Sequence, residues 1–254
     1  MQPYEQNRYA WGTTATRSQV EVDQGLRAFM LGVYNHMTLG LAISGLVALG
    51  TNMMAVTQAA SGRMALTPFG QLLYTSPLKW VVMLAPLAFV FFFSFRMDRM
   101  SAATARTVFL LFAAVMGLSL STLFLVFKLG SIVQVFFITA ATFGALSLWG
   151  YTTTRSLSGM GSFLLMGLIG IVIASLVNIF LGSPGLQFAI SVLGVLIFAG
   201  LTAYDTQKLK EMYVYGDYDG EAAAKASVFG ALTLYLDFIN MFQFLLSLFG
   251  NRNE

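Results

Sequence analysis

Cysteine is absent from this chain of 254 residues, and histidine occurs only once, as His36. Without cysteine there are no disulfide bonds, no thiolate nucleophile and no cysteine-ligated metal, and one histidine excludes the multi-histidine metal motifs. Glycine-rich nucleotide-binding motifs of the Walker and kinase types are missing too, so active pumping is not expected. No residue pattern predicts a bound cofactor.

Charged residues are also scarce, at 10% of the chain, whereas a soluble domain has roughly 25%. Hydrophobic residues make up 57%, with 23 Phe and 14 Met among them. This composition predicts a multi-pass protein whose main partner is the lipid bilayer. The net charge of +3 comes from cations scattered at the ends of apolar segments, so no nucleic-acid partner is expected.

Long apolar runs predict an all-α membrane protein with seven transmembrane helices. A helix needs about 20 mainly apolar residues to cross the bilayer. Runs of this kind occupy residues 28–50, 78–96, 107–127, 131–150, 162–182, 187–207 and 228–249. Six spans followed by a re-entrant C-terminal segment are the alternative.

The chain divides into a polar N-terminal tail at 1–26, a transmembrane domain at 27–250 and a short C-terminal tail at 251–254. Ten of the 14 Lys and Arg residues fall on the side of the bundle that carries the N-terminal tail. The positive-inside rule therefore predicts a cytoplasmic N-terminus and, with seven spans, an external C-terminus. Asp205 then lies near the cytoplasmic end of the sixth span, and Asp237 lies about halfway along the seventh.

These two aspartates are the acids that a membrane-spanning helix accommodates least easily. An Asp at the centre of a span costs about 2.5–3.5 kcal/mol on insertion scales, and such groups often mark an ion or proton path. Thr233, Asp237 and Asn240 are spaced to share one polar face of the seventh span. Thr202 and Asp205 share a face of the sixth span.

If the two polar faces meet, the aspartates form a pair that holds one shared proton or one cation. Two carboxylates in a low-dielectric site rarely ionise together, so the charge of the pair would change with pH. This chemistry predicts a pH-gated cation path. The alternatives are structural: Asp205 reaches interfacial water or pairs with Lys208 or Lys210, and Asp237 fixes helix packing through a buried hydrogen bond.

Two other ionisable residues are candidates for a role beside the pair. Arg96 ends the second span and could neutralise Asp205 as a latch, or it could mark topology by extending to the membrane surface. His36, in the first third of the first span, could sense pH, or it could be a hydrogen-bonded packing residue.

Three segments resemble the Bax inhibitor-1 family of membrane proteins, in its bacterial branch. They read "GLTAYDTQKLKEMY", "ALTLYLDFINMFQFLLSLFG" and "ALSLWGYTTTRSLSGMGSFLLMGLIGIVIASLVNIFL". The resemblance implies a seven-helix bundle with the last helix central and a pH-sensitive calcium leak. It also implies that an aspartate pair on the last two helices is the sensor, matching Asp205 and Asp237, where calcium could bind. A basic residue from the second helix accompanies the pair in the family, and Arg96 is the matching position.

The resemblance also bears on location and partners. It implies the cytoplasmic (inner) membrane of a bacterium, and bacterial relatives are linked to a membrane-anchored ATP-dependent protease that they restrain. A non-enzymatic regulator that uses the tail at 1–26 to bind such a protease is therefore the alternative function. An enzyme is not expected, because the glycine-x-glycine-aspartate box of intramembrane aspartyl proteases is replaced here by "LYLD" ending at Asp237.

Overall fold

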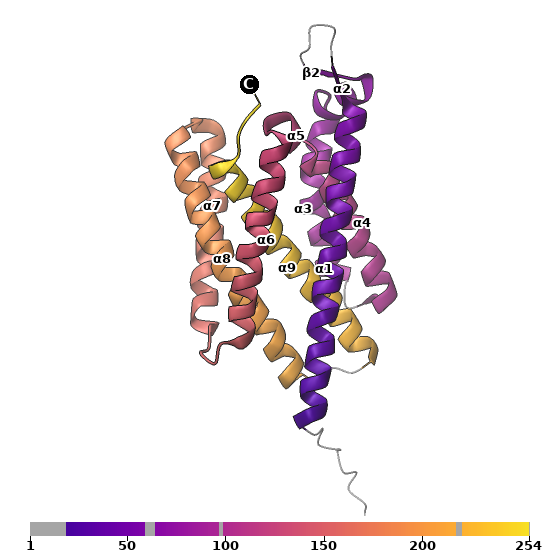
Figure 1. The fold of residues 1–254 in the computed structure, drawn as a ribbon, viewed down its shortest axis with the longest axis vertical. Helices are drawn as coiled ribbons and strands as arrows, with labels where there is room; N and C mark the ends of the chain where they lie inside the picture. The colour runs from indigo at the N-terminus through magenta and orange to yellow at the C-terminus, as the bar shows by residue number, and fades with distance from the viewer. Residues whose placement is uncertain (1–18, 59–63, 97–98, 217–219, 254) are drawn as a thin grey trace, which may run out of the picture.

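The computed structural model describes residues 19–58, 64–96, 99–216 and 220–253, and shows a bundle of long helices (Figure 1). Of the predicted N-terminal tail, residues 1–18 lie outside the described residues. Strands β1 and β2 form a small antiparallel hairpin. The elements in chain order are α1 Gln19–Ala55, β1 Val56–Gln58, β2 Met64–Leu66, α2 Pro68–Tyr74, α3 Leu78–Arg96, α4 Ala102–Leu120, α5 Leu123–Val126, α6 Leu129–Thr152, α7 Ser158–Leu181, α8 Pro184–Tyr215 and α9 Gly220–Phe249.

The bundle has the dimensions of a membrane domain. Within the described residues, six helices are long and apolar enough to cross a membrane, namely α1, α4 continued by α5, α6, α7, α8 and α9. The pair α2 and α3 is bent by 58° and makes a seventh span if it is counted as one. The predicted all-α membrane bundle is therefore confirmed. Helix α9 runs without a break, and the bend falls at α2–α3 instead.

The connection between α7 and α8 shows how local sequence ends and starts a span. Gly182 adopts φ 58°, in the left-handed region that favours glycine, and ends α7. Ser183 then caps α8, its hydroxyl accepting a hydrogen bond from the Leu186 backbone N–H at 3.3 Å. Pro184 occupies the first turn, where no backbone N–H is needed. The two helices consequently form the tight antiparallel pair that this turn predicts.

Several helices extend beyond the predicted apolar spans. The sixth span was predicted to end at residue 207, whereas α8 continues to Tyr215. An apolar run reports the thickness of the hydrocarbon core, but lysine, glutamate and methionine continue a helix readily outside it. Asp205 consequently lies well inside a continuous helix, with about three turns following it.

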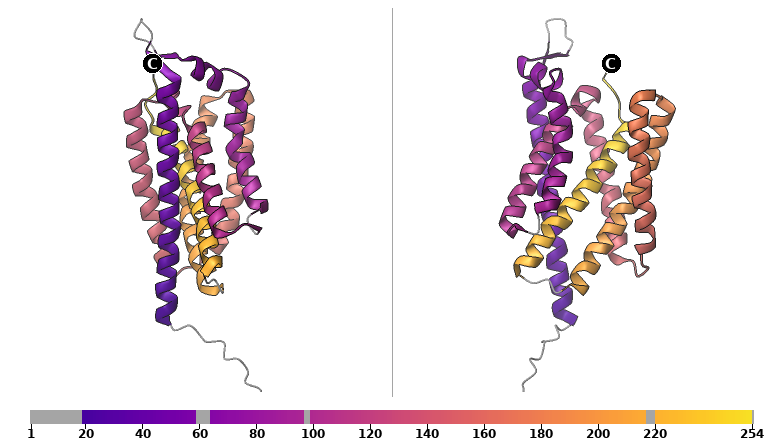
Figure 2. Two further views of the ribbon diagram at one scale, coloured as in Figure 1. Left: turned by 90° about the vertical axis from the view of Figure 1, so that its right-hand side faces the viewer. Right: turned by 180° about the vertical axis from the view of Figure 1, so that it is seen from behind.

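Helix α9 is more deeply buried than any other candidate span in the described part of the chain. It crosses the bundle obliquely (Figure 2) and contacts α1, α4, α6 and α8. Tyr235 and Met241 on this helix are completely buried. Because α9 packs against helices from both halves of the chain, it positions its own polar residues inside the protein.

The segment after α9 folds back onto the turn between α5 and α6. The Asn251 carbonyl oxygen accepts a hydrogen bond from the Lys128 N–H at 2.9 Å, and the Asn253 N–H donates to the Val126 carbonyl oxygen at 2.9 Å. The Ser131 hydroxyl oxygen accepts from the Asn251 N–H at 2.9 Å. These bonds fix the end of α9 against the start of α6.

Candidate functional site

The structure brings Asp205 and Asp237 together where α8 packs against α9. The two carboxyl groups lie within interaction distance of each other. Asp237 is buried, and its Oδ2 atom has no hydrogen-bond partner among the described residues. Asp205 is half-buried, and so lies on the more accessible side of the pair. The two aspartates therefore meet in the fold, and their joint role as a site stays a prediction.

One cation belongs to the surroundings of the pair. Lys208, one helical turn beyond Asp205, acts electrostatically on the Asp205 carboxyl. The Lys208 Nζ atom also lies 5.9 Å from the ring centroid of Tyr204, within the range of a cation–π contact. The arrangement therefore places positive charge beside Asp205 at the helix surface, while Asp237 faces the bundle interior.

Thr202 of α8 and Thr233 and Asn240 of α9 each bond within their own helix, and their role beside the pair stays a prediction. The Thr202 and Thr233 hydroxyls each donate to the backbone carbonyl four residues earlier, at 2.8 and 3.2 Å. The Asn240 Nδ2 atom donates in the same way at 2.8 Å. These bonds use donor hydrogens and leave the hydroxyl lone pairs and the amide oxygen as acceptors. Such oxygens can face a proton donor or a cation.

Arg96 is not brought to the aspartate pair in this conformation. It ends α3, is exposed, and forms no ion pair with another described residue. Helix α3 packs chiefly against α2 and α4 rather than against α8 or α9. The group that acts as the nearby cation is Lys208, which the sequence presented only as an alternative partner. The role of Arg96 as a latch stays a prediction.

His36 is accounted for by a contact within its own helix. Its Nδ1 atom lies 2.7 Å from the Gly32 carbonyl oxygen, four residues earlier in α1. Because a carbonyl oxygen can only accept, this contact requires a proton on Nδ1. The geometry favours the packing interpretation of His36, and its role in pH sensing stays a prediction.

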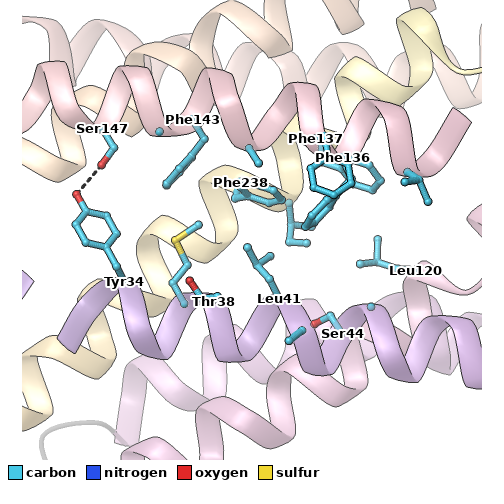
Figure 3. A pocket seen from close by; sticks show the side chains of 18 of the residues that line it. Tyr34, Thr38, Leu41, Ser44, Leu120, Phe136, Phe137, Phe143, Ser147 and Phe238 are labelled. Carbon is cyan, nitrogen blue, oxygen red and sulfur yellow. Dashed lines mark hydrogen bonds between the residues drawn. The ribbon is translucent and has the colours of Figure 1, made fainter. Parts of the chain in front are cut away.

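A chain of hydroxyl groups that the sequence did not reveal reaches the site from α1. The Tyr34 hydroxyl lies 2.7 Å from the Ser147 Oγ atom on α6 (Figure 3). Ser147 Oγ lies 2.9 Å from the Thr206 hydroxyl on α8, which donates to the Thr202 carbonyl oxygen at 2.7 Å. Thr206 is adjacent to Asp205 in the chain. The large separations in sequence explain why no spacing pattern predicts this chain of contacts.

The residues after Asp205 hold the loop between α6 and α7. The Gln207 Oε1 atom accepts from the Leu157 N–H at 2.7 Å, and its Nε2 atom donates to the Arg155 carbonyl oxygen at 2.9 Å. Lys210 Nζ donates to the Tyr151 carbonyl oxygen at 2.9 Å. This polar stretch of α8 therefore joins the aspartate pair to a neighbouring loop.

A second buried polar cluster lies elsewhere on α9. The Ser44 hydroxyl on α1 donates to the Ala113 carbonyl oxygen of α4 at 2.6 Å, and Tyr235 OH lies 2.6 Å from the same Ser44 oxygen. Tyr235 is completely buried between the Phe109 and Phe112 rings. This cluster joins α1, α4 and α9 and has the character of a structural tie.

The geometry defines a class: a multi-pass α-helical membrane protein with a buried and a half-buried acid paired on two packed helices. The sequence model of the family described as "Inhibitor of apoptosis-promoting Bax1" matches residues 26–254. The chain is 47% identical over 246 residues to an uncharacterised protein of Caulobacter vibrioides, covering 97% of each chain. It is 45% identical over 238 residues to the inner membrane protein YbhL of Escherichia coli strain K12, covering 92% of this chain and 96% of YbhL. This protein belongs to the Bax inhibitor-1 family.

Proposed function

We propose that the protein is a pH-gated cation leak channel, with calcium as its ion, in the inner membrane of a bacterium. The observation that carries the proposal is the meeting of Asp205 and Asp237 inside the bundle, with one buried carboxylate oxygen lacking a partner in the described chain. The name of YbhL supports the membrane. The uneven distribution of Lys and Arg supports an N-terminus in the cytoplasm.

The gate in this proposal is the charge of the aspartate pair. Removing both protons from two adjoining carboxyls in a low-dielectric site is costly, so the pair holds one proton at intermediate pH. The remaining negative charge attracts Lys208, which lies beside Asp205, and keeps the cytoplasmic end of the path closed. A second proton neutralises the pair and releases the cation, so the leak increases as the pH falls. Arg96 takes the place of Lys208 if α3 moves towards α8 and α9.

The oxygens around the pair suit a passing cation better than a tightly held one. Calcium prefers six to eight oxygen ligands. The two aspartates with Thr202, Thr233 and Asn240 offer only part of that shell. In the described chain, no group of three or more Asp, Glu, His or Cys side chains could hold a metal ion. A weak, partly hydrated contact is what conduction requires, because an ion must leave the site as easily as it enters.

The test is calcium flux into proteoliposomes that contain the purified protein, measured from pH 5 to 8. Wild type is expected to conduct more at the acidic end, whereas Asp205→Asn and Asp237→Asn are expected to lose the pH dependence. Glu211→Gln is the matched control, because Glu211 is another half-buried acid on α8. Potassium and proton fluxes identify the ion. An inserted, folded wild type that passes no cation at any pH would overturn the proposal.

The alternative is a non-enzymatic regulator that binds and restrains a membrane-anchored ATP-dependent protease. It depends on the tail at 1–26, most of which lies outside the described residues, so it rests on the resemblance alone. Removing residues 1–18 separates the two functions. If the truncated protein no longer binds a protease but conducts as before, the regulator is favoured. If it keeps both protease binding and flux, the tail has a role in neither function.

A further inference from the structure

A deep apolar groove runs between α1 and α6. Both helices pack against α9, yet they make little contact with each other. The space between them is a cavity of about 1370 Å³. Phe238 of α9 lies at its floor (Figure 3), and Phe242 of α9 lines it as well. On its walls Leu46, Phe137 and Leu148 are 71%, 67% and 62% exposed. Because α1 and α6 are membrane-spanning helices, the groove opens sideways into the bilayer.

Aromatic rings of α6 cover the floor of the groove. The Phe238 ring centroid lies 5.4 Å from that of Phe136 and 5.6 Å from that of Phe143, and Phe238 is only 2% exposed. An occupant of the groove therefore contacts the exposed apolar side chains of the two walls. The length of the groove and the polarity of its ends indicate which occupant it takes.

One end of the groove is polar and charged. Arg27 and Asp23 of α1 line this end together with Tyr151 of α6, and Lys210 donates to the Tyr151 carbonyl oxygen directly behind it. Leu49 lines the other end. At 1.5 Å per residue, Arg27 and Leu49 are about 33 Å apart along α1, close to the ~30 Å thickness of the hydrocarbon core. The charged end is therefore at one membrane surface.

We propose that this groove binds a phospholipid with an ammonium-bearing headgroup. One acyl chain lies between α1 and α6 against the exposed apolar side chains of both walls, and the phosphate contacts the Arg27 guanidinium, which pairs well with phosphate oxygens. Asp23, one turn earlier in α1, faces the ammonium group and disfavours headgroups with only negative charge. The charge pattern thus matches a zwitterionic lipid such as phosphatidylethanolamine.

The bound chain would contact the hydroxyl chain that leads to the aspartate pair. Tyr34 and Ser147 both line the groove, and their 2.7 Å contact is a bridge across it (Figure 3). From Ser147 the contacts continue to Thr206, next to Asp205. A lipid bound in the groove would therefore contact side chains that are hydrogen-bonded to α8, the helix that carries Asp205. The lipid proposal does not depend on channel activity.

The groove offers substitutions that fill it without disturbing the backbone. A Cβ atom added at Gly45 of α1 or at Gly144 of α6 would meet no atom within 4 Å, and both residues are exposed and line the groove. Gly45→Leu and Gly144→Leu therefore occupy the groove from opposite walls. Gly170→Leu is the matched control, because Gly170 is equally open but lies on α7, away from the groove.

Native mass spectrometry of the delipidated full chain in detergent, titrated with dioleoyl phosphatidylethanolamine, tests the proposal. Wild type and Gly170→Leu are expected to retain one lipid, and Gly45→Leu and Gly144→Leu to lose it. Equal retention by the wild type and all three variants would mean ordinary annular lipid and overturn the proposal. A dimer that dissociates in the two blocked variants would do so as well, because a second copy would then be the occupant.

The headgroup is tested with the same measurement. Dioleoylglycerol, which lacks the phosphate, is expected not to bind, and Arg27→Gln is expected to weaken phosphatidylethanolamine binding about fivefold. Arg106→Gln is the control, since Arg106 is an exposed arginine on α4 outside the groove. Asp23→Asn is expected to let phosphatidylglycerol bind as well as phosphatidylethanolamine. Equal binding of dioleoylglycerol and phospholipid would overturn the assignment of Arg27.

Discussion

Asp237 is the residue whose placement needs the most explanation. A buried carboxyl oxygen with no partner raises the free energy of the folded protein by about 1–3 kcal/mol, and more when it is charged. Asp237 Oδ2 is such an oxygen within the described chain, and its nearest ionisable neighbour is another acid. Helical spacing in the sequence predicts that Asp205 and Asp237 can meet. It does not reveal the unpartnered oxygen, which depends on how α8 and α9 are rotated.

We expect Asp237→Asn to stabilise the protein, and to do so more at pH 8 than at pH 5. At pH 8 the wild-type pair carries at least one negative charge in a low-dielectric site, whereas the amide carries none. At pH 5 the wild-type pair holds more protons, so the difference shrinks. Each kcal/mol corresponds to about 2–4 °C in Tm for a protein of this size. Thermal unfolding in detergent at pH 5 and pH 8 measures the change in Tm that Asp237→Asn causes, with Glu211→Gln as control. An equal change in Tm at the two pH values would contradict the reasoning.

At the scale of the helices, apolar run length predicted where each long helix lies but not how the helices pack. The hairpin, α2 and α5 were missed, because each is too short to leave a periodic pattern. The contacts of Tyr34, Ser147 and Thr206 were missed because they join α1, α6 and α8 across long separations. Small residues let membrane helices approach closely, and the structure shows at which positions they do so.

At Gly150, α6 closely approaches α8. A Cβ atom there would overlap the backbone of Ala203, two residues before Asp205. Gly150→Ala should therefore push the helices apart and destabilise the protein by about 1–3 kcal/mol. Gly144→Ala, on the open face of α6, should be neutral or stabilising by up to about 1 kcal/mol, because alanine favours a helix. The Tm values of the Gly150→Ala and Gly144→Ala proteins test this prediction. Similar Tm values would mean that α6 and α8 separate at little cost in free energy.

For the whole molecule, the prediction concerns the direction in which the bundle crosses the membrane. The two ends of the bundle are separated by the length of its helices, and the loops alternate between them (Figures 1 and 2). The bias of Lys and Arg predicts which end faces the cytoplasm, whereas the fold by itself is compatible with either direction.

The absence of cysteine provides a direct measurement of this direction. Thr154 lies in the loop between α6 and α7 and is exposed at the end of the bundle that is predicted to be cytoplasmic. Thr75 follows α2 and is exposed at the opposite end. In intact spheroplasts, a membrane-impermeant maleimide should label Thr75→Cys at once and Thr154→Cys only after permeabilisation. The unsubstituted protein is the blank, because it has no thiol. The reverse labelling order would invert the topology and place the aspartate pair towards the outer side.

The position of α9 also has a consequence for biosynthesis. Helices α1, α4, α6 and α8, against which α9 packs, all precede it in the chain. They consequently leave the ribosome and enter the membrane before the helix that fills the space between them. Until α9 arrives, their inner faces, with Thr206 and Ser44 among them, are covered by lipid or by the insertion machinery. The last step of insertion therefore closes the bundle and brings Asp237 to Asp205, so the site cannot exist on a nascent chain that lacks α9.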